Sequence, residues 1–406
     1  MKYDENLLYN IKSKYNGTRY VLFDLAIWKN GRAFKKNDFS ETGKPIIKIA
    51  ELNNGINVNT AYTQGDYGDE VYIKPGDLLF SWSGNPKTSI DVFRYGMQDG
   101  WLNQHIFKIT AKEEIVIKDY LYYILKYLKP RFMQIASNKQ TTGLGHVTVA
   151  DLKRINLVLP SKELQAQMVA ILKVLDEKIE NNNKINNNLE QQAQSYFQEL
   201  FVDNADPEWT TGTISDLGAV VGGSTPSKAK PEYYTESGIA WITPKDLSIN
   251  KSKFVSHGEN DITELGLKNS SAAIMPEGTV LFSSRAPIGY IAIAAGEVTT
   301  NQGFKSVVPK PEIGTPFVYF FLKNTLPVIE GMASGSTFKE VSGSTMKNVP
   351  AVIPDAETLA KFSDFCAPIF AQQRILEEQN QSLATLRDNL LPKLMSGEID
   401  VSAVQL

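Results

Sequence analysis

The chain has 406 residues, of which 42% are hydrophobic and 21% are charged, so it can bury the cores of two or more domains of ordinary size. Its 42 Lys and Arg against 45 Asp and Glu give a net charge of −3, which excludes a uniformly basic nucleic-acid coat but not a local basic face. One cysteine excludes an internal disulfide framework and a cysteine-based zinc site. The polar first residues and the lack of ~18 to 20 consecutive apolar residues predict a soluble, cytoplasmic protein.

The sequence repeats itself once, with a period of about 200 residues. A period of this length is that of a duplicated domain plus its connector, and it is too long for a solenoid. The matched segments are GDLLFS (76–81) with GTVLFS (278–283), NQHIFK (103–108) with NQGFK (301–305), which is one residue shorter, DYLYYILK (119–126) with PFVYFFLK (316–323), and LKRINLVLP (152–160) with MKNVPAVIP (346–354).

Each repeat begins with a segment rich in Gly, Pro, aromatic and β-branched residues, which is typical of a mostly β domain. Within it, the sequence predicts a short helix at about 118–129 in the first repeat and 316–323 in the second. A long helix follows, over about 161–201 and 355–396. Pro392 is expected to interrupt and kink the last turns of the second long helix.

These elements predict an α+β fold with an internal pseudo-twofold repeat. Two mostly β domains, 1–160 and 206–354, are expected to alternate with two helical segments, 161–205 and 355–406. We expect the β domains to be separated by the two long helices.

Along both long helices, residues of one stripe recur in steps of four and three, and each residue of the second stripe lies 194 positions beyond its counterpart. This rhythm over about five heptads predicts an antiparallel coiled coil between the two helices. The alternative is that each amphipathic helix packs on its own domain. In the register set by the twofold symmetry, Met168 meets Leu394 and Asn182 faces Asn380, with Asn186 on the same stripe. A buried Asn pair costs stability but disfavours slipped registers.

The sequence contains no recognisable catalytic motif. There is no G-x-x-x-x-G-K-[ST] phosphate loop and no Asn-Pro-Pro-aromatic signature of an amino-methyltransferase. The three histidines lack metal-ligand spacing, and Cys366 lies on the coiled-coil stripe, where a core residue is expected. We therefore expect no catalytic residue, no metal site and no cofactor bound by this chain.

What remains is a binding surface. Residues 1–160 have a net charge of +6, whereas 161–205, 206–354 and 355–406 have −3, −2 and −4. Polar loops recur at matching places in the two β domains, with amides suited to adenine, Arg and Lys suited to guanine and phosphate, and hydroxyls suited to either. The candidate DNA-binding residues are Ser81, Trp82, Ser83, Asn85, Asn103, Gln104, Lys139, Gln140, Thr141, Thr142, Thr243, Lys245, Ser283, Ser284, Arg285, Asn301, Gln302, Ser334, Ser336, Thr337 and Lys339. From composition alone, these segments could equally be ordinary polar loops. Because the net charge of the second β domain is −2, we expect a partner to supply contacts to the DNA phosphates.

Local phrases along nearly the whole chain are similar to those of one protein family. They are KPGDLLFSWSG (74–84), LNQHIFKI (102–109), ITPKDL (242–247), PEGTVLFSSRAPIGYIAI (276–293), TNQGFKSV (300–307) and LRDNLLPKLMSGEIDV (386–401). With the repeated order of β domain and long helix, they resemble the specificity subunits of type I restriction–modification systems.

The resemblance implies a non-catalytic, sequence-specific DNA-binding subunit that serves DNA methylation and phage defence. Each β domain would be a target-recognition domain that reads one half of a bipartite, asymmetric target in double-stranded DNA, while the helices set the spacer. The implied partners are two modification subunits, which bind S-adenosylmethionine and methylate adenine, and restriction or translocase subunits, which use ATP and magnesium. No membrane partner is expected. One alternative is a stand-alone enzyme with two β domains, which no motif supports. The other is a coiled-coil scaffold that does not bind DNA.

Overall fold

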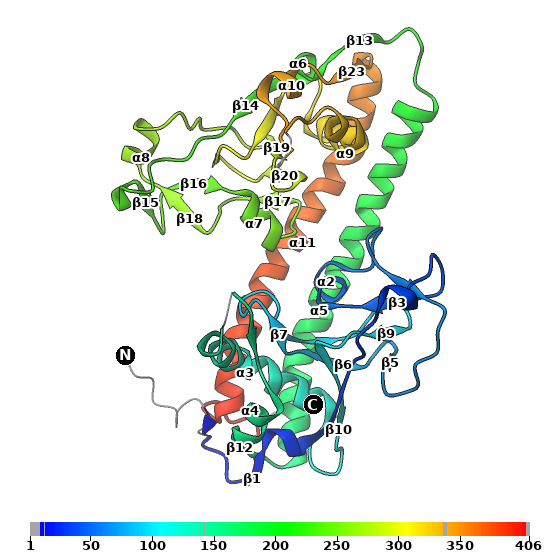
Figure 1. Ribbon diagram of the computed structural model, residues 1–406. Coiled ribbons are helices and arrows are strands. Elements are labelled where there is room, and N and C mark those ends of the chain that lie inside the picture. The colour runs from blue at the N-terminus through cyan, green and yellow to red at the C-terminus, as the bar shows by residue number, and fades with distance from the viewer. Residues whose placement is uncertain (1–8, 12, 141–142, 336–338, 403–406) are drawn as a thin grey trace. The chain divides into compact units, whose positions relative to one another are not determined.

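The computed structural model of the chain describes residues 9–11, 13–140, 143–335 and 339–402 (Figure 1). The chain forms two compact units. Unit 1 comprises residues 1–178 and 383–406, and unit 2 comprises residues 179–382. Each unit contains one mostly β domain and a part of both long helices, because the division between the units cuts through these helices.

The β domain of unit 1 contains two four-stranded sheets and two strand pairs. The first sheet has the antiparallel order β2-β10-β6-β8, and the second has the order β4-β3-β9-β5 with β3 and β9 parallel. The strand pairs are β1-β12 and β11-β7. The strands are β1 (Thr18–Val21), β2 (Ala26–Asn30), β3 (Lys44–Ile47), β4 (Tyr62–Thr63), β5 (Tyr72–Ile73), β6 (Leu78–Ser81), β7 (Ser83–Gly84), β8 (Asp91–Arg94), β9 (Gly100–Leu102), β10 (Ile106–Ala111), β11 (Gly145–His146) and β12 (Asn156–Leu159).

The β domain of unit 2 follows a similar plan. Its larger sheet has the order β14-β22-β19-β20-β17, and the other has β15-β18-β16-β21 with β16 and β21 parallel; β13 pairs with β23. The strands are β13 (Thr210–Thr213), β14 (Gly218–Gly222), β15 (Tyr234–Thr235), β16 (Ile239–Ile242), β17 (Phe254–Val255), β18 (Asn260–Ile262), β19 (Val280–Ser284), β20 (Ile288–Ala294), β21 (Thr299–Thr300), β22 (Lys305–Pro309) and β23 (Pro350–Ile353).

Short helices connect the strands, and two long helices extend through both units. The short helices are η1 (Leu22–Leu25), η2 (Lys36–Asp38), α2 (Ile49–Asn54), α3 (Lys118–Asn138), α4 (Val149–Arg154), α6 (Ile214–Leu217), η4 (Pro231–Tyr233), α7 (Pro244–Ile249), α8 (Glu264–Lys268), α9 (Thr315–Gly331) and α10 (Gly343–Lys347). The long helices are α5 (Lys162–Gln198), which continues as one π-helical turn η3 (Glu199–Asp203), and α11 (Ala356–Ser396).

The strand register corrects one detail of the predicted repeat. On β6 and β10, Ser81 lies opposite Ile106, and in unit 2 Ser283 lies opposite Phe304. The expected one-residue shortening of NQGFK is therefore wrong, because Phe304 occupies the place of Ile106 and no residue is missing. The Phe-Lys pairs of the two phrases therefore occupy positions one residue apart.

The helices α3 and α9 are longer than predicted. Both continue through a proline, Pro130 in α3 and Pro327 in α9, although proline removes one backbone hydrogen bond. Residues beyond each proline, such as Phe132 and Ile329, are buried, so packing against the core supports the extra turns. Pro392 does not interrupt α11, which remains helical to its end, contrary to the prediction.

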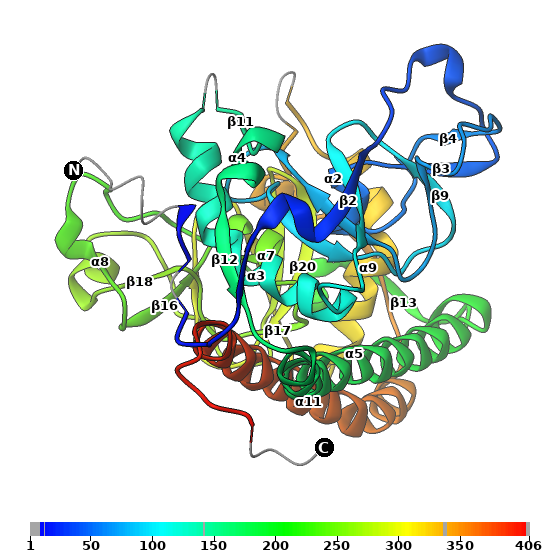
Figure 2. The same ribbon diagram turned by 90° about the horizontal axis from the view of Figure 1, so that it is seen from below.

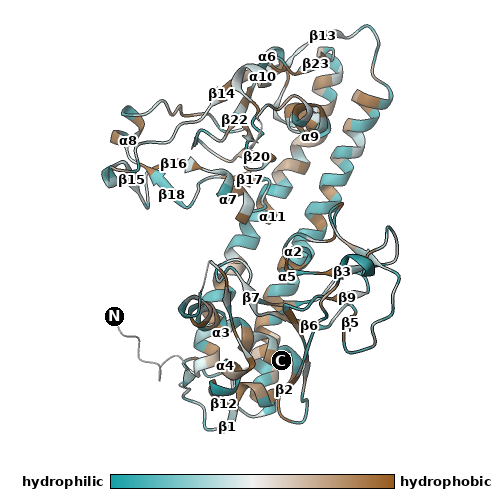
Figure 3. Ribbon diagram, in the orientation of Figure 1, coloured by the Kyte–Doolittle hydropathy of each residue, from teal (hydrophilic) through white to brown (hydrophobic). Residues whose placement is uncertain are grey.

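In unit 1, the start of α5 and the end of α11 complete the hydrophobic core. Met168 and Leu172 of α5 and Leu394 of α11 are at most 1% exposed and belong to the same apolar cluster as the β domain. The hydroxyl of Tyr15 donates to the carbonyl of Leu394 at 2.7 Å. Figure 3 shows apolar and polar residues alternating along these helices, as a helix with one buried face requires.

In unit 2, the remaining parts of α5 and α11 lie side by side and antiparallel (Figures 1 and 2). Asn182 Nδ2 donates to Asn380 Oδ1 at 2.9 Å, and Asn380 Nδ2 donates to Asn183 Oδ1 at 2.8 Å. Further along, Gln373 Nε2 donates to the carbonyl of Asn186 at 3.1 Å. The structure thus brings the predicted Asn pair together, and it confirms the predicted α+β fold with antiparallel long helices.

Beyond this polar layer, toward the end of α5, aromatic rings fill the core of unit 2. Phe197 of α5 lies within 6 Å, between ring centres, of Phe317 and Phe320 of α9 and of Phe362 of α11. Cys366 is fully buried, and burial raises the pKa of its thiol to about 12. The prediction of Cys366 as a core residue is confirmed.

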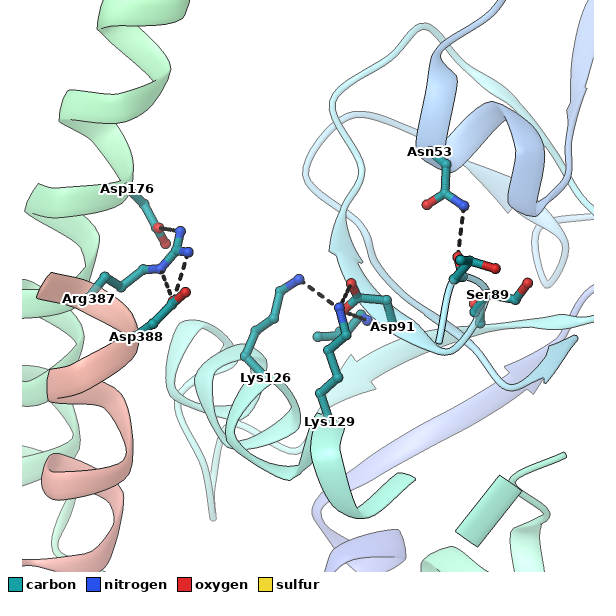
Figure 4. Close-up of polar contacts among 11 residues, drawn as sticks. Asn53, Ser89, Asp91, Lys126, Lys129, Asp176, Arg387 and Asp388 are labelled. Atoms are coloured by element: carbon teal, nitrogen blue, oxygen red, sulfur yellow. Dashed lines mark hydrogen bonds and ion pairs between the residues drawn. The ribbon is translucent and has the colours of Figure 1, made fainter. Parts of the chain in front are cut away.

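A carboxylate on α5 joins the β domain to both helices in unit 1. Asp176 accepts hydrogen bonds from Tyr123 Oη of α3 at 2.7 Å and from Arg94 Nη1 of β8 at 3.2 Å, and Arg387 Nη1 of α11 is 2.9 Å away. Figure 4 shows the pair of Asp176 and Arg387. Next to it, α3 is fastened to β8 by ion pairs of Asp91 with Lys126 at 2.9 Å and with Lys129 at 2.6 Å.

A second carboxylate, Glu190 of α5, has this role in unit 2. It contacts Lys253 Nζ at 2.8 Å, Lys323 Nζ at 2.5 Å and Tyr319 Oη at 3.1 Å. Burial would raise the pKa of Glu190, but the two lysines outweigh it and lower the pKa to about 2. Burial lowers the pKa of Lys253 to about 8, against the opposing effect of Glu190.

Replacing both Asn182 and Asn380 with Leu should stabilise unit 2. Asn182 is 0% exposed, and its Oδ1 has no hydrogen-bond partner among the described residues. Removing such a group should raise the free energy of unfolding by about 1–3 kcal/mol and loosen the helix register. Chemical denaturation of the full chain measures the change, and a marked loss of stability would contradict it.

Glu190→Gln should remove part of the acid sensitivity of the fold. A carboxylate whose pKa falls from 4.5 to about 2 on folding stabilises the protein above pH 4.5, and this stability is lost as the pH falls toward 2. Its size is on the order of 3 kcal/mol. In thermal unfolding, we expect E190Q to have a lower melting temperature than the wild type at pH 7. Its melting temperature should also change less between pH 4.5 and 2.

Glu180→Gln is the matched control for this prediction, because Glu180 pairs with Lys184 on the exposed face of the same helix. An exposed pair of this kind contributes less than about 1 kcal/mol. Equal acid sensitivity of the wild type and E190Q would contradict the assigned role of Glu190.

Candidate nucleic-acid interface

A hollow of about 610 Å³ in unit 2 brings together five of the predicted residues. They are Thr243 and Lys245 at the start of α7, Arg285 after β19, and Asn301 and Gln302 after β21. The other lining residues are Thr225, Lys228, Tyr234, Trp241, Pro244, Asp246, Glu259, Asn260, Ala286 and Gly303. Amides, hydroxyls, cations and carboxylates all face this hollow, which is a mixture suited to base edges.

The N-terminal cap of α7 forms part of the lining of the hollow. Both the backbone N–H and the hydroxyl of Thr243 donate to Asp246 Oδ2, at 2.7 and 2.6 Å, so this hydroxyl already serves the fold. Asp246 Oδ1 accepts from the backbone N–H of Glu259 at 2.9 Å. Lys245 forms an ion pair with Glu259, and both side chains are 62% exposed. Of these groups, Lys245 and Glu259 are accessible to a ligand.

The two residues of the Asn-Gln turn in unit 2 have different roles: Asn301 fixes the turn, and Gln302 is accessible. Asn301 Oδ1 accepts from the backbone N–H of Gly303 at 2.8 Å, which fixes the turn after β21. Gln302 is exposed and accepts a hydrogen bond from the hydroxyl of Thr225. Gln302 is therefore the more accessible amide.

The corresponding turn of unit 1 carries Asn103, Gln104 and His105. Asn103 and Gln104 are half-buried, and Gln104 Nε2 lies 3.2 Å from His105 Nε2. The Trp82 ring lies 5.5 Å from His105, and its Nε1 donates to Asn30 Oδ1 at 2.9 Å. These side chains form one polar and aromatic surface at the ends of β2, β6 and β9.

The next two predicted residues of unit 1 follow Trp82. Ser83 is buried, and its hydroxyl lies 2.8 Å from His146 Nδ1 of β11. Asn85 is exposed, and its Oδ1 accepts from the backbone N–H of Lys87 at 2.9 Å. Asn85 is accessible at this end of the sheet, whereas Ser83 supports the loop.

Three of the predicted serines are fully buried. The hydroxyl of Ser81 donates to the carbonyl of Ser89, that of Ser283 to Pro287 at 2.8 Å, and that of Ser284 to Gly303 at 3.1 Å. Because these hydroxyls hydrogen-bond the protein's own backbone, we assign them to loop support rather than to contact with DNA.

The remaining predicted residues lie near the ends of α3 and α9. Lys139 contacts Asp151 at 2.5 and 2.7 Å, while Gln140 is exposed. Ser334 and Lys339 are exposed, and Ser334 pairs with Glu340 through two backbone hydrogen bonds. Four further predicted residues lie outside the described residues, namely Thr141, Thr142, Ser336 and Thr337.

The sequence prediction missed two cations of unit 1. Arg32 lies beside Asn103, 4.5 Å from the centre of the Tyr67 ring, and its side chain is 47% exposed. Lys48 is the N-cap residue of α2, as Thr243 is of α7, and each donates its backbone N–H to the acid three residues on, so Lys48 occupies the corresponding place. The segments that carry Arg32 and Lys48 differ too much from the corresponding segments of unit 2 to be aligned from sequence.

A glycine at the same place in both repeats could have aligned these segments. Gly31 and Gly223 follow the paired edge strands β2 and β14. A Cβ at Gly31 would lie 2.1 Å from the carbonyl oxygen of Asn103, and one at Gly223 would lie 2.0 Å from that of Asn301. Glycine is needed at both places because the first loop of each domain packs directly on the Asn-Gln turn.

The part of the chain that the structure describes contains no cluster of three or more His, Cys, Asp or Glu residues able to hold a metal ion. Within the same residues, no helix is both long and apolar enough to cross a bilayer.

Comparison with known proteins identifies the family. The model of the type I restriction modification DNA specificity domain matches residues 20–191 and 207–386. The chain therefore belongs to the type I restriction–modification DNA specificity family. Its two matches correspond to the two repeats.

Individual relatives agree with this family. The MjaIX specificity subunit of Methanocaldococcus jannaschii is 39% identical, over less than half of either chain: 45% of this chain and 44% of the relative. The HindI specificity subunit of Haemophilus influenzae is 24% identical over 80% of this chain and 87% of its own length. The solved S subunit from M. genitalium has a similar fold, with a TM-score of 0.54, 17% identity, and coverage of 95% of this chain and 99% of the other. These similarities agree with a specificity rather than a catalytic subunit and give no support to a scaffold that does not bind DNA.

Gly223→Ala should disturb the Asn-Gln turn of unit 2. The added methyl group would overlap the carbonyl oxygen of Asn301, so the turn must shift, at a cost of roughly 1–3 kcal/mol in stability. Gly222→Ala is the matched control, since its nearest atom would be the flexible Lys305 Cδ at 3.9 Å. Denaturation of both variants measures the difference, and equal stability of the two would contradict the close packing inferred here.

Proposed function

We propose that this chain is the DNA-reading subunit of a type I restriction–modification complex. The observation that carries the proposal is that each β domain has a polar surface around an Asn-Gln turn. The family model also matches the chain twice, once in each repeat. Asn85, Gln104 and Arg32 are the proposed contacts in the first domain, and Lys245 and Gln302 are among those in the second. Residues 1–160 and 206–354 are the proposed target-recognition domains.

The target is bipartite and asymmetric in this proposal. Corresponding positions on the two surfaces carry different side chains, as with Lys48 and Thr243 or with His105 and Gly303. Direct readout depends on the donors and acceptors that reach the base edges. Two surfaces with different side chains would therefore prefer different half-sites.

The helical segments 161–205 and 355–406 set the spacer between the half-sites and dock two modification subunits. With 37 and 41 residues, α5 and α11 are about 55 and 60 Å long. Asn182, Asn186 and Asn380 keep the register of the pair. A stiff pair of helices would fix the separation of the two readers along the duplex.

Catalysis belongs to the partner subunits in this proposal. Two modification subunits bind S-adenosylmethionine and methylate adenine, and restriction or translocase subunits use ATP and magnesium. The net charge of −3 supports this division, because binding to phosphates requires cations that partners would add. The chain would act in the cytoplasm, where the DNA is.

Lengthening both helices tests the spacing role. One heptad inserted after residue 178 and another after residue 382 would add about 10 Å to each helix, or about three base pairs at 3.4 Å each. We expect a longer spacer between unchanged half-sites. The measurement maps adenine methylation in a host that expresses this chain with its modification subunits and has no other adenine methylation.

The same heptad inserted after Asn250, in the exposed connection between α7 and β17, is the control and should leave the spacer unchanged. A spacer of the original length in the variant with longer helices, or new half-sites with the old spacer, would contradict the proposed role.

A further inference from the structure

Corresponding places in the two β domains carry different charges. Trp82 and Ser284 occupy the same place, since each donates its backbone N–H across the sheet, to His105 in unit 1 at 3.2 Å and to Gly303 in unit 2 at 2.7 Å. The next residue is Ser83 in unit 1 and Arg285 in unit 2. A neutral hydroxyl thus corresponds to a permanent cation.

The partners of these two residues correspond as well. Ser83 lies 2.8 Å from His146 Nδ1, and Arg285 Nη1 lies 3.4 Å from Glu340 Oε2. The carbonyl of the residue before each accepts from a valine, Val147 in unit 1 and Val341 in unit 2, which directly follows the respective partner. Glu340 therefore occupies the place in unit 2 that corresponds to His146 in unit 1, and each contacts the residue under comparison.

Arg285 is both oriented and accessible. Its side chain is 37% exposed and lines the hollow of unit 2 beside Gln302, while Glu340 holds one edge of the guanidinium through Nη1. A planar guanidinium held by one edge can present its other nitrogens as a fork. Such a fork matches two adjacent acceptors on a ligand.

The mixed charge of the hollow favours a base over a phosphate. The cations Lys228, Lys245 and Arg285 and the carboxylates Asp246 and Glu259 line it, and two of the cations are paired with glutamates, Lys245 with Glu259 and Arg285 with Glu340. A phosphate contact needs a cation whose charge is not already offset, whereas a guanidinium among amides and carboxylates matches the alternating donors and acceptors of base edges. Guanine offers the paired acceptors O6 and N7 in the major groove, to which Arg binds in a bidentate manner.

We infer that Arg285, positioned by Glu340, reads a guanine in the half-site recognised by unit 2, and that Ser83 gives the other half-site no equivalent contact. This inference rests on the proposed function and adds the base class that one residue selects. Arg285 is the contacting residue, and Glu340 is a positioning residue.

The test maps adenine methylation for the full chain, co-expressed with its modification subunits, as wild type and as Arg285→Ala, Arg285→Lys and Glu340→Gln. In R285A, we expect one guanine position of one half-site to become degenerate, with discrimination there reduced about ten- to a hundredfold. R285K should relax the same position, because an ammonium keeps the charge but loses the fork. E340Q should relax it to a smaller extent. The other half-site should stay unchanged in all three variants and serves as the internal control.

Arg374→Ala is the matched control variant. Arg374 also pairs with carboxylates in unit 2, Glu277 at 2.5 Å and Glu378 at 3.1 Å, but it belongs to α11 and does not line the hollow. We expect R374A to keep the full target sequence.

Three results would overturn the inference. They are an unchanged target in R285A, a relaxed position that is not guanine, and a uniform loss of methylation that R285K restores, which would mark a phosphate contact. Failure of the proposed function is distinguishable from these, because the wild-type chain itself would then direct no methylation to a bipartite target.

Discussion

The antiparallel pairing of α5 with α11 is the constraint on which both units depend. In unit 1, Leu394 from the end of the chain is buried in the same core as Met168 and the β domain. In unit 2, Phe197 and Phe362 of the two helices close the core against α9. Neither β domain has a complete hydrophobic core without helical segments from two distant parts of the sequence. The two repeats are therefore interdependent, although each carries its own polar surface around an Asn-Gln turn.

Ion pairs between different residues attach the β domain to the helices in the two units. Asp176 joins Arg94 and Arg387 in unit 1, whereas Glu190 joins Lys253 and Lys323 in unit 2. Both acids belong to α5, but they do not occupy matching positions of the repeat. Buried or half-buried carboxylates of this kind need their cations, since an unpaired charge in such surroundings is costly. The two repeats thus differ in their attachment to the helices as well as in the side chains around their Asn-Gln turns.

Much of the architecture could be predicted from sequence, because its signals are periodic or repeated. The 4-3 rhythm predicted the helix pair, and the twofold symmetry of the repeat placed Asn182 opposite Asn380. Exposure could not be predicted in the same way: Ser81 and Ser283 are polar residues in recognisable phrases, yet their hydroxyls turn inward to the backbone. Arg32 and Lys48 were missed because they lie on segments that only the strand pairing aligns with unit 2.

We propose that this one chain carries two unlike DNA-reading domains on a shared pair of helices. The most direct measurement replaces residues 206–354 with the corresponding domain of another specificity subunit and maps adenine methylation in cells that also express the modification subunits. We expect one half of the target to change to that of the donor, while the other half and the spacer persist. A target that persists in full, or one that changes in both halves, would contradict this proposal.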